Sequence, residues 1–94
     1  MTWYYDSHVH LSDLSYSDDI DSIISTMEQI KLKACCVSMN TQDSEKTLSL
    51  AQATELILPF IGIHPECVYD DLELMTEMIE KNIKSLGGIG EIGL

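Results

Sequence analysis

The chain has 94 residues, with 16 acidic side chains against five lysines and no arginine, and its formal net charge is −11. This length fits one small domain, and so acidic a balance excludes a surface that grips nucleic acid through its own positive charge. An anionic substrate could still bind through metal ions, because a bound cation can dominate the local field.

The first half of the chain predicts two strands separated by a helix. Residues 3–11 predict a strand in which positions 4, 6, 8 and 10 share one face. The polar residues 12–17 can supply an N-cap for a helix over 18–30, where isoleucine and methionine recur at helical spacing, and Asp18 and Asp19 suit its first turn. The short apolar run ACCVSM, residues 34–39, predicts a buried parallel strand.

The second half repeats this order. Thr41 can cap a helix that runs to about Ala53, and residues 56–63 predict a third strand. A helix over 70–84 and a glycine-rich strand over 87–94 follow. The resulting β-α-β-α-β-α-β order requires a parallel sheet with right-handed crossovers, so we expect an α/β fold.

Cysteine usage and hydropathy indicate the compartment. Cys35, Cys36 and Cys67 are odd in number, two of them are adjacent, and no signal-peptide pattern is found at the N-terminus. We therefore expect reduced thiols and a cytoplasmic location. The longest apolar stretch has eight residues and contains a proline and a glycine, so we expect no membrane partner.

Two histidines sit two residues apart near the end of the first predicted strand, in the sequence DSHVHL. Residues two apart in a strand project to the same side, about 6.5–7 Å apart, so the rings of His8 and His10 can converge on one metal ion. The alternative is a pair of ordinary polar residues at a strand end. Asp6 has the same parity, so its carboxylate could hold a ring N–H or bind the ion itself.

Two further side chains stand near the ends of later strands. His64, in GIHPE, follows the third predicted strand and should lie at the carboxyl end of the sheet, where sites gather; the alternative is a histidine that caps a turn. Glu91, in GGIGEIGL, lies among apolar residues and glycines, so its burial would require a partner such as a metal ion. An exposed edge-strand glutamate is the alternative. We expect these two side chains to join His8 and His10 at one rim.

The motifs DSHVH, GIHP and GEIGL in series resemble the TatD family of metal-dependent deoxyribonucleases, within the amidohydrolase-like superfamily, over the whole chain. The resemblance implies a TIM-type β/α-barrel, and residues 1–94 would be its N-terminal portion, truncated after the fourth strand. It also implies that His8, His10 and Glu91 bind two divalent ions (zinc, magnesium or manganese), with Glu91 bridging them. By the same resemblance His64 contacts substrate phosphate. Glu66 departs from the family, which often has a histidine or an aromatic residue there.

The function implied by the resemblance is hydrolysis of the phosphodiester bonds of DNA by a metal-activated water. The family's remaining ligands, two histidines and an aspartate that acts as the base, come from later strands. We therefore expect no catalytic base within residues 1–94, and little or no activity from this chain alone.

Two other functions fit the same residues. Another hydrolase of the superfamily, acting on amides, lactones or phosphate monoesters, would also carry His-x-His on its first strand. The usual dinuclear members, however, bridge their metals with a modified lysine where this chain has Glu91. A non-catalytic fragment or interaction module is the second alternative, because half of the implied ligands are absent. Open sheet edges in such a fragment would allow a homo-oligomer through edge-to-edge pairing.

Overall fold

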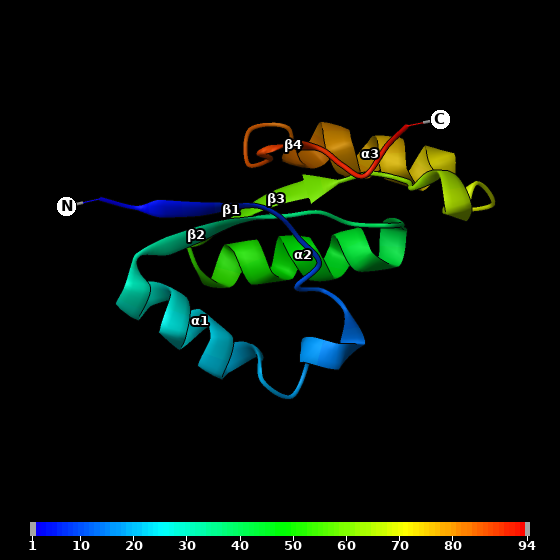
Figure 1. Ribbon diagram of the computed structural model, residues 1–94. Coiled ribbons are helices and arrows are strands. Elements are labelled where there is room, and N and C mark those ends of the chain that lie inside the picture. Colours follow the sequence, from blue (N-terminus) through cyan, green and yellow to red (C-terminus); the bar gives the residue numbers. More distant parts are fainter. Residues whose placement is uncertain (1, 94) are drawn as a thin grey trace.

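A computed structural model describes residues 2–93, and its helices and strands follow the predicted order (Figure 1). The strands are β1 (Tyr4–Val9), β2 (Leu32–Cys36), β3 (Ile57–Ile61) and β4 (Gly88–Ile89). The helices are α1 (Ile20–Ile30), α2 (Thr41–Ala53) and α3 (Leu72–Asn82), with short 3-10 helices η1 (Leu14–Tyr16) after β1 and η2 (Pro65–Cys67) after β3. The fourth strand is shorter than predicted, and Leu94, its predicted last residue, lies outside the described residues.

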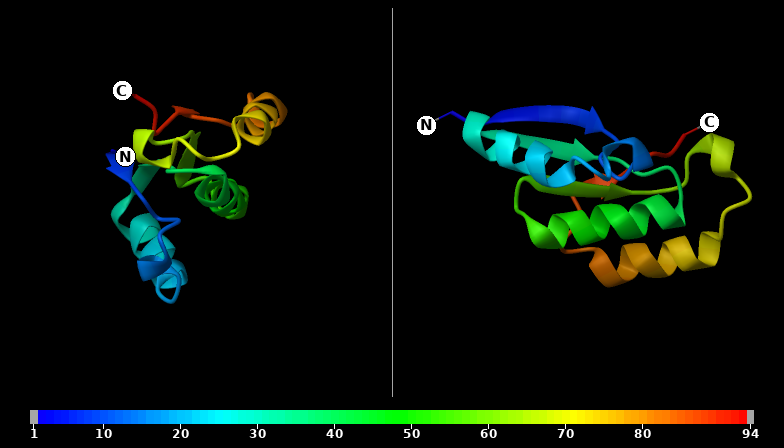
Figure 2. Two further views of the ribbon diagram at one scale, coloured as in Figure 1. Left: turned by 90° about the vertical axis from the view of Figure 1, so that its right-hand side faces the viewer. Right: turned by 90° about the horizontal axis from the view of Figure 1, so that it is seen from below.

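All four strands are parallel and are ordered β1-β2-β3-β4, so each pairs with its neighbours in the sequence. The sheet is curled, and the three helices lie on one side of it (Figure 2). This is a half-barrel of the kind that forms the N-terminal part of a TIM-type β/α-barrel, which confirms the predicted fold class. β1 and β4 stand at the two ends of this strand order; pairing of these edges with a second copy stays a prediction.

Burial alternates along the central strands, and this alternation separates the two faces of the sheet. Residues 34 and 36 of β2, and 57, 59 and 61 of β3, are buried, whereas the residues between them are only partly buried. The buried set packs against Met27 of α1 and against Met75 and Met78 of α3. Burying one such side chain contributes about 1.5–3 kcal/mol. The helix-covered face of the sheet therefore forms the core, and the opposite face, here called the open face, is not covered by the helices.

The cysteines fit this division. Cys35, Cys36 and Cys67 are all unpaired, in agreement with the expectation of reduced thiols. Burial raises the pKa of the Cys36 thiol to about 12, so this residue stays protonated and acts as a small core side chain. No helix within residues 2–93 is both long enough and apolar enough to span a bilayer.

The helix starts differ from the sequence prediction. Residues 12–17 do not cap α1; they contribute η1, and the N-cap residue of α1 is Asp19, whose side chain makes no capping hydrogen bond. Thr41, the predicted cap of α2, is instead its first helical residue; the cap is Asn40, whose side-chain oxygen accepts the backbone N–H of Asp43 at 2.9 Å. The backbone N–H and the hydroxyl of Thr41 both donate to Asp70.

Asp70, in the loop before α3, holds the start of α2. Its carboxylate accepts the backbone N–H of Thr41 at 2.6 Å and the Thr41 hydroxyl at 3.0 Å. Desolvation by itself would raise the pKa of Asp70, but hydrogen bonds from Thr41 and from the backbone N–H of Asp71 outweigh it, and the net pKa is lowered. The ionised carboxylate therefore stabilises the fold.

We predict that Asp70→Ala lowers the free energy of unfolding by about 1 kcal/mol near neutral pH, because a helix N–H and a hydroxyl lose their acceptor. Since the folded-state pKa lies below the usual 3.8, the stabilisation is present above that value and is lost as pH falls through the folded-state pKa. Urea denaturation of both proteins at about pH 7 and about pH 3 measures this. Thr41→Ala, which keeps the backbone bond, should cost less. Equal stabilities near pH 7 would contradict the prediction.

Candidate metal centre

A β-bulge in β1 decides which way His8 and His10 point. Asp6 and Val9 are three apart, yet they pair with two residues of β2 that are only two apart. Partners in a parallel pair project to the same face, so Asp6 and Val9 share the helix-covered face of the sheet. His8 and His10 flank Val9 and therefore project from the open face.

The bulge separates Asp6 from the two histidines, so the shared face predicted for all three is wrong. One extra residue in a strand reverses the alternation of every side chain beyond it. The Asp6 carboxylate accepts the backbone N–H of His8 at 3.0 Å, and this hydrogen bond stabilises the backbone of the bulge. A part for Asp6 in metal binding stays a prediction, and the contact that the structure gives it is to the backbone of His8 rather than to an imidazole N–H.

Glu91 reaches the open face from β4, the edge strand on the opposite side of the sheet from β1. Just after β4, the backbone N–H of Glu91 donates to the carbonyl of Ser38 at 2.7 Å, and the N–H of Ser38 donates to the carbonyl of Gly90 at 3.1 Å. The chain here crosses directly over Gly62, where an added Cβ would lie 2.5 Å from the carbonyl oxygen of Glu91. Glycine is therefore required at position 62 for this approach.

Ser38 is a positioning residue that the sequence analysis missed. It is fully buried, and its hydroxyl is hydrogen-bonded to the hydroxyl of Thr47 in α2 at 2.8 Å and to the carbonyl oxygen of Phe60 in β3 at 3.0 Å. With its two backbone bonds it joins β2, β3 and α2 to the segment that carries Glu91. The only signal in the sequence was a lone serine near the end of the apolar run ACCVSM.

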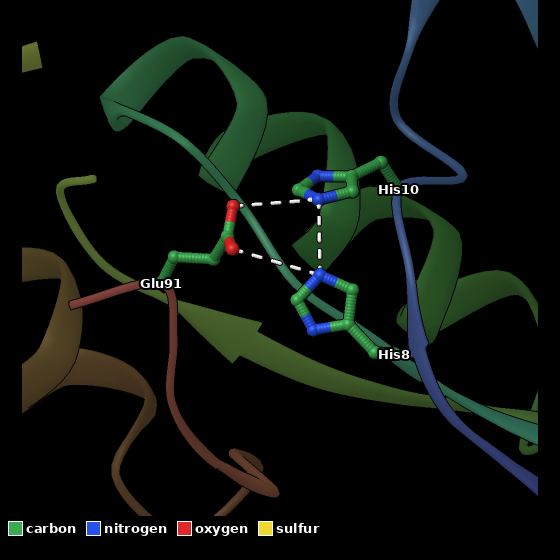
Figure 3. A group of neighbouring side chains, drawn as sticks. All are labelled: His8, His10 and Glu91. Atoms are coloured by element: carbon green, nitrogen blue, oxygen red, sulfur yellow. Dashed lines mark hydrogen bonds and ion pairs between the residues drawn. The ribbon is translucent and has the colours of Figure 1, made fainter. Parts of the chain in front are cut away.

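His8, His10 and Glu91 meet at the carboxyl ends of the strands (Figure 3). The two Nε2 atoms are 3.3 Å apart. Glu91 Oε1 lies 3.5 Å from Nε2 of His8, and Oε2 lies 3.3 Å from Nε2 of His10. The side chains are 54%, 32% and 22% exposed in chain order, so the group is open to solvent on the His8 side.

These separations suit a bound cation. Two imidazole nitrogens and a carboxylate oxygen, one from each residue, lie within 4.8 Å of one another. Ligand atoms held tetrahedrally at about 2.0–2.1 Å from an ion are roughly 3.3–3.4 Å apart, close to the distances between these side chains. The mixed donors suit zinc and manganese, and the carboxylate also suits magnesium. Metal binding by His8, His10 and Glu91 stays a prediction that this geometry supports.

His64 lies at the same rim, outside the group of three that the described residues form. Its backbone N–H donates to the carbonyl of Met39 at 2.8 Å, and its ring caps η2, because Nδ1 accepts the backbone N–H of Glu66 at 3.0 Å. The turn-capping alternative is therefore what the structure shows for Nδ1. In a neutral ring the proton is then on Nε2, which remains a donor for a substrate.

Comparison with known proteins adds family information to this geometry. Residues 5–94 match the sequence model of the family described as TatD related DNase. The chain is 27% identical over 101 residues to the putative deoxyribonuclease TATDN3 of Mus musculus, with 95% of this chain and 34% of that protein covered. It is 29% identical over 96 residues to the uncharacterized metal-dependent hydrolase MG009 of Mycoplasma genitalium, with 96% and 37% covered. The chain thus spans about a third of the length of these curated relatives.

We predict that Gly62→Ala weakens the binding of a divalent metal ion by about 10–100-fold, because the new Cβ displaces the backbone that positions Glu91. Calorimetric titration with manganese or zinc measures the affinity, and circular dichroism confirms that the variant is folded. Gly90→Ala is the matched control, since its Cβ would make an ordinary contact at 3.4 Å with Val37. Wild-type affinity in Gly62→Ala, or an equal loss in both variants, would show that Gly62 does not position Glu91.

Proposed function

The chain belongs to the family of TatD-related DNases, and we propose that it supplies part of the active site of a metal-dependent hydrolase that cleaves the phosphodiester bonds of DNA. The observation that carries this proposal is the convergence of His8, His10 and Glu91 on the open face of the half-barrel (Figure 3). Because the chain spans about a third of its relatives' length, the proposed activity is that of a protein of their length.

The first task of these residues is to hold the metal. His8 and His10 would bind through Nε2, which requires neutral rings that carry their protons on Nδ1. The Glu91 carboxylate would supply negative charge opposite the two rings, and the family resemblance implies two ions in the complete site. A bound divalent ion would lower the pKa of a water and offset the charge of the phosphate. The chain contains no arginine, so none of its own residues can offset the phosphate charge with a guanidinium group.

His64 would hold the substrate phosphate. Its backbone is tied to the carbonyl of Met39, and its ring is tied to the backbone N–H of Glu66, so the direction of Nε2 is fixed before substrate arrives. A hydrogen bond from Nε2–H to a phosphate oxygen is charge-assisted, and such bonds are roughly twice as strong as neutral ones. Preorganised donors of this kind orient the phosphate without a cost at the moment of reaction.

A cytoplasmic location and the pairing of two copies are further proposals. The unpaired cysteines fit a reducing compartment, and the two end strands of the sheet, β1 and β4, fit a homo-oligomer formed edge to edge. Neither is needed for the proposed chemistry. Light scattering across a dilution series addresses the second.

We predict that His8→Ala, His10→Ala and Glu91→Gln each weaken manganese binding by about 10-fold or more, because each removes one of three converging ligands. His64→Ala should bind manganese like the wild type, since His64 lies outside the group. Calorimetry or the electron paramagnetic resonance signal of free manganese measures the affinity. Wild-type binding by His8→Ala would overturn the proposed metal site.

We predict that the 94-residue chain cleaves a DNA oligonucleotide at least about 100-fold more slowly than a protein of the relatives' length, because the resemblance places the catalytic base on a later strand. Gel analysis of metal-supplemented reactions measures both rates. Robust cleavage by the 94-residue chain, lost on His8→Ala, would contradict this prediction.

The same longer protein should be assayed with an amide, a lactone and a phosphate monoester. Faster turnover of any of these than of DNA would favour another hydrolase of the superfamily over the proposed nuclease.

A further inference from the structure

A pocket lies beside the metal centre, between the segment after β1 and the first turns of α2. Its volume is about 250 Å³, and its walls include His10, Ser12, Asp13, Asp43 and Lys46. His10 belongs both to this wall and to the metal group. This pocket, here called the His10 pocket, therefore adjoins the metal centre through the His10 side chain.

Ser12 is a buried residue in the wall of the His10 pocket. The residue is only 6% exposed, and its hydroxyl has no hydrogen-bond partner within residues 2–93. Leaving a buried hydroxyl unpaired is unfavourable, and rotation about its Cα–Cβ bond can turn it toward a ligand in the His10 pocket, one of two neighbouring pockets that Ser12 lines. Ser44 carries the other such hydroxyl, but Ser44 does not line this pocket.

The charges of the His10 pocket decide which class of ligand fits. Asp13 accepts the backbone N–H of Ser15 at 2.9 Å, and this hydrogen bond is the main reason that the pKa of Asp13 is lowered, so its carboxylate is ionised. Asp43 adds a second carboxylate, so two negative charges face the single positive charge of Lys46. A further anion is disfavoured there, whereas a neutral group that donates hydrogen bonds is favoured.

The two carboxylates are not equally free. One oxygen of Asp13 is used by Ser15, and the charge of Asp13 is met by Lys46. Asp43 is half-buried, and its backbone N–H is taken by the side chain of Asn40. Because one oxygen of Asp13 is already used by Ser15, we take the Asp43 carboxylate as the acceptor for a ligand in the His10 pocket.

We propose that the His10 pocket binds the nucleobase next to the scissile phosphate and selects a base that carries an exocyclic amino group. Such an amino group donates to the carboxylate of Asp43, as cytosine N4 does to acidic side chains in base recognition. The Ser12 hydroxyl donates to an acceptor on the ring, and the side chains of Leu14 and Met39 in the same walls can contact its apolar faces. This inference rests on the proposed function, because a nucleic-acid substrate is what brings a base beside the phosphate.

The test compares 2′-deoxycytidine with 2′-deoxyuridine in an NMR titration of the full chain without metal. The two probes share a sugar and lack phosphate, and they differ in the exocyclic amino group and the adjoining ring nitrogen. We expect deoxycytidine to bind about fivefold more tightly, with the largest shifts at residues 12–14 and 42–46, and Asp43→Ala to remove the difference. Equal affinities, no binding, or unchanged discrimination in Asp43→Ala would overturn the proposal.

Ser12→Ala and Ser44→Ala form a matched pair, since both remove a buried hydroxyl that lacks a partner. Neither should lower the midpoint of urea denaturation, but only Ser12→Ala should weaken deoxycytidine binding, by about fivefold. Equal binding by the two variants would overturn the assignment of Ser12. Because no metal or phosphate is present in the titration, its failure, while a protein of the relatives' length still cleaves DNA, overturns the base pocket and leaves the proposed function standing. Binding of deoxycytidine to the chain, while a protein of that length fails to cleave DNA, instead overturns the proposed function.

Discussion

Two backbone hydrogen bonds between Ser38 and the segment of Gly90 and Glu91 hold the candidate site together. They join the end of β2 to the residues just after β4, although β3 lies between these strands in the sheet. Ser38 can serve as this anchor because it is fully buried and its own hydroxyl is satisfied by Thr47 and Phe60. A buried polar network that is fully paired is rigid. Glu91 therefore reaches the histidines of β1 on a backbone that has little freedom.

The bulge in β1 is the second requirement, because it decides on which face the histidines lie. Asp6 pairs with a buried residue of β2, so strict alternation would have placed His8 and His10 on the helix-covered face. One inserted residue moves both rings to the open face. The helix-covered face thus keeps its apolar core, while the candidate metal ligands lie on the face of the sheet that the helices leave uncovered.

The proposed anionic substrate has to be bound by an acidic chain, so its charge must be offset at the site itself. In the proposed enzyme the phosphate is met by metal ions and by the Nε2–H of His64, and the neighbouring carboxylates of the His10 pocket meet a neutral base instead. Lys46 is the one lysine in the walls of that pocket, and Asp13 offsets it. The same negative charge that excludes general attraction of nucleic acid thus leaves room for recognition at short range.

The order of strands and helices, the parallel sheet and the candidate ligands His8, His10 and Glu91 could all be predicted from the amino-acid sequence. Periodicity and residue type are local properties, and parallel topology brings strand ends to one rim whatever the details. The separation of Asp6 from the histidines, the Asn40 cap of α2 and the positioning roles of Ser38 and Gly62 became evident in the folded chain. Each of these depends on a register shift, a backbone angle or a contact between distant segments, and no single stretch of sequence encodes such a contact.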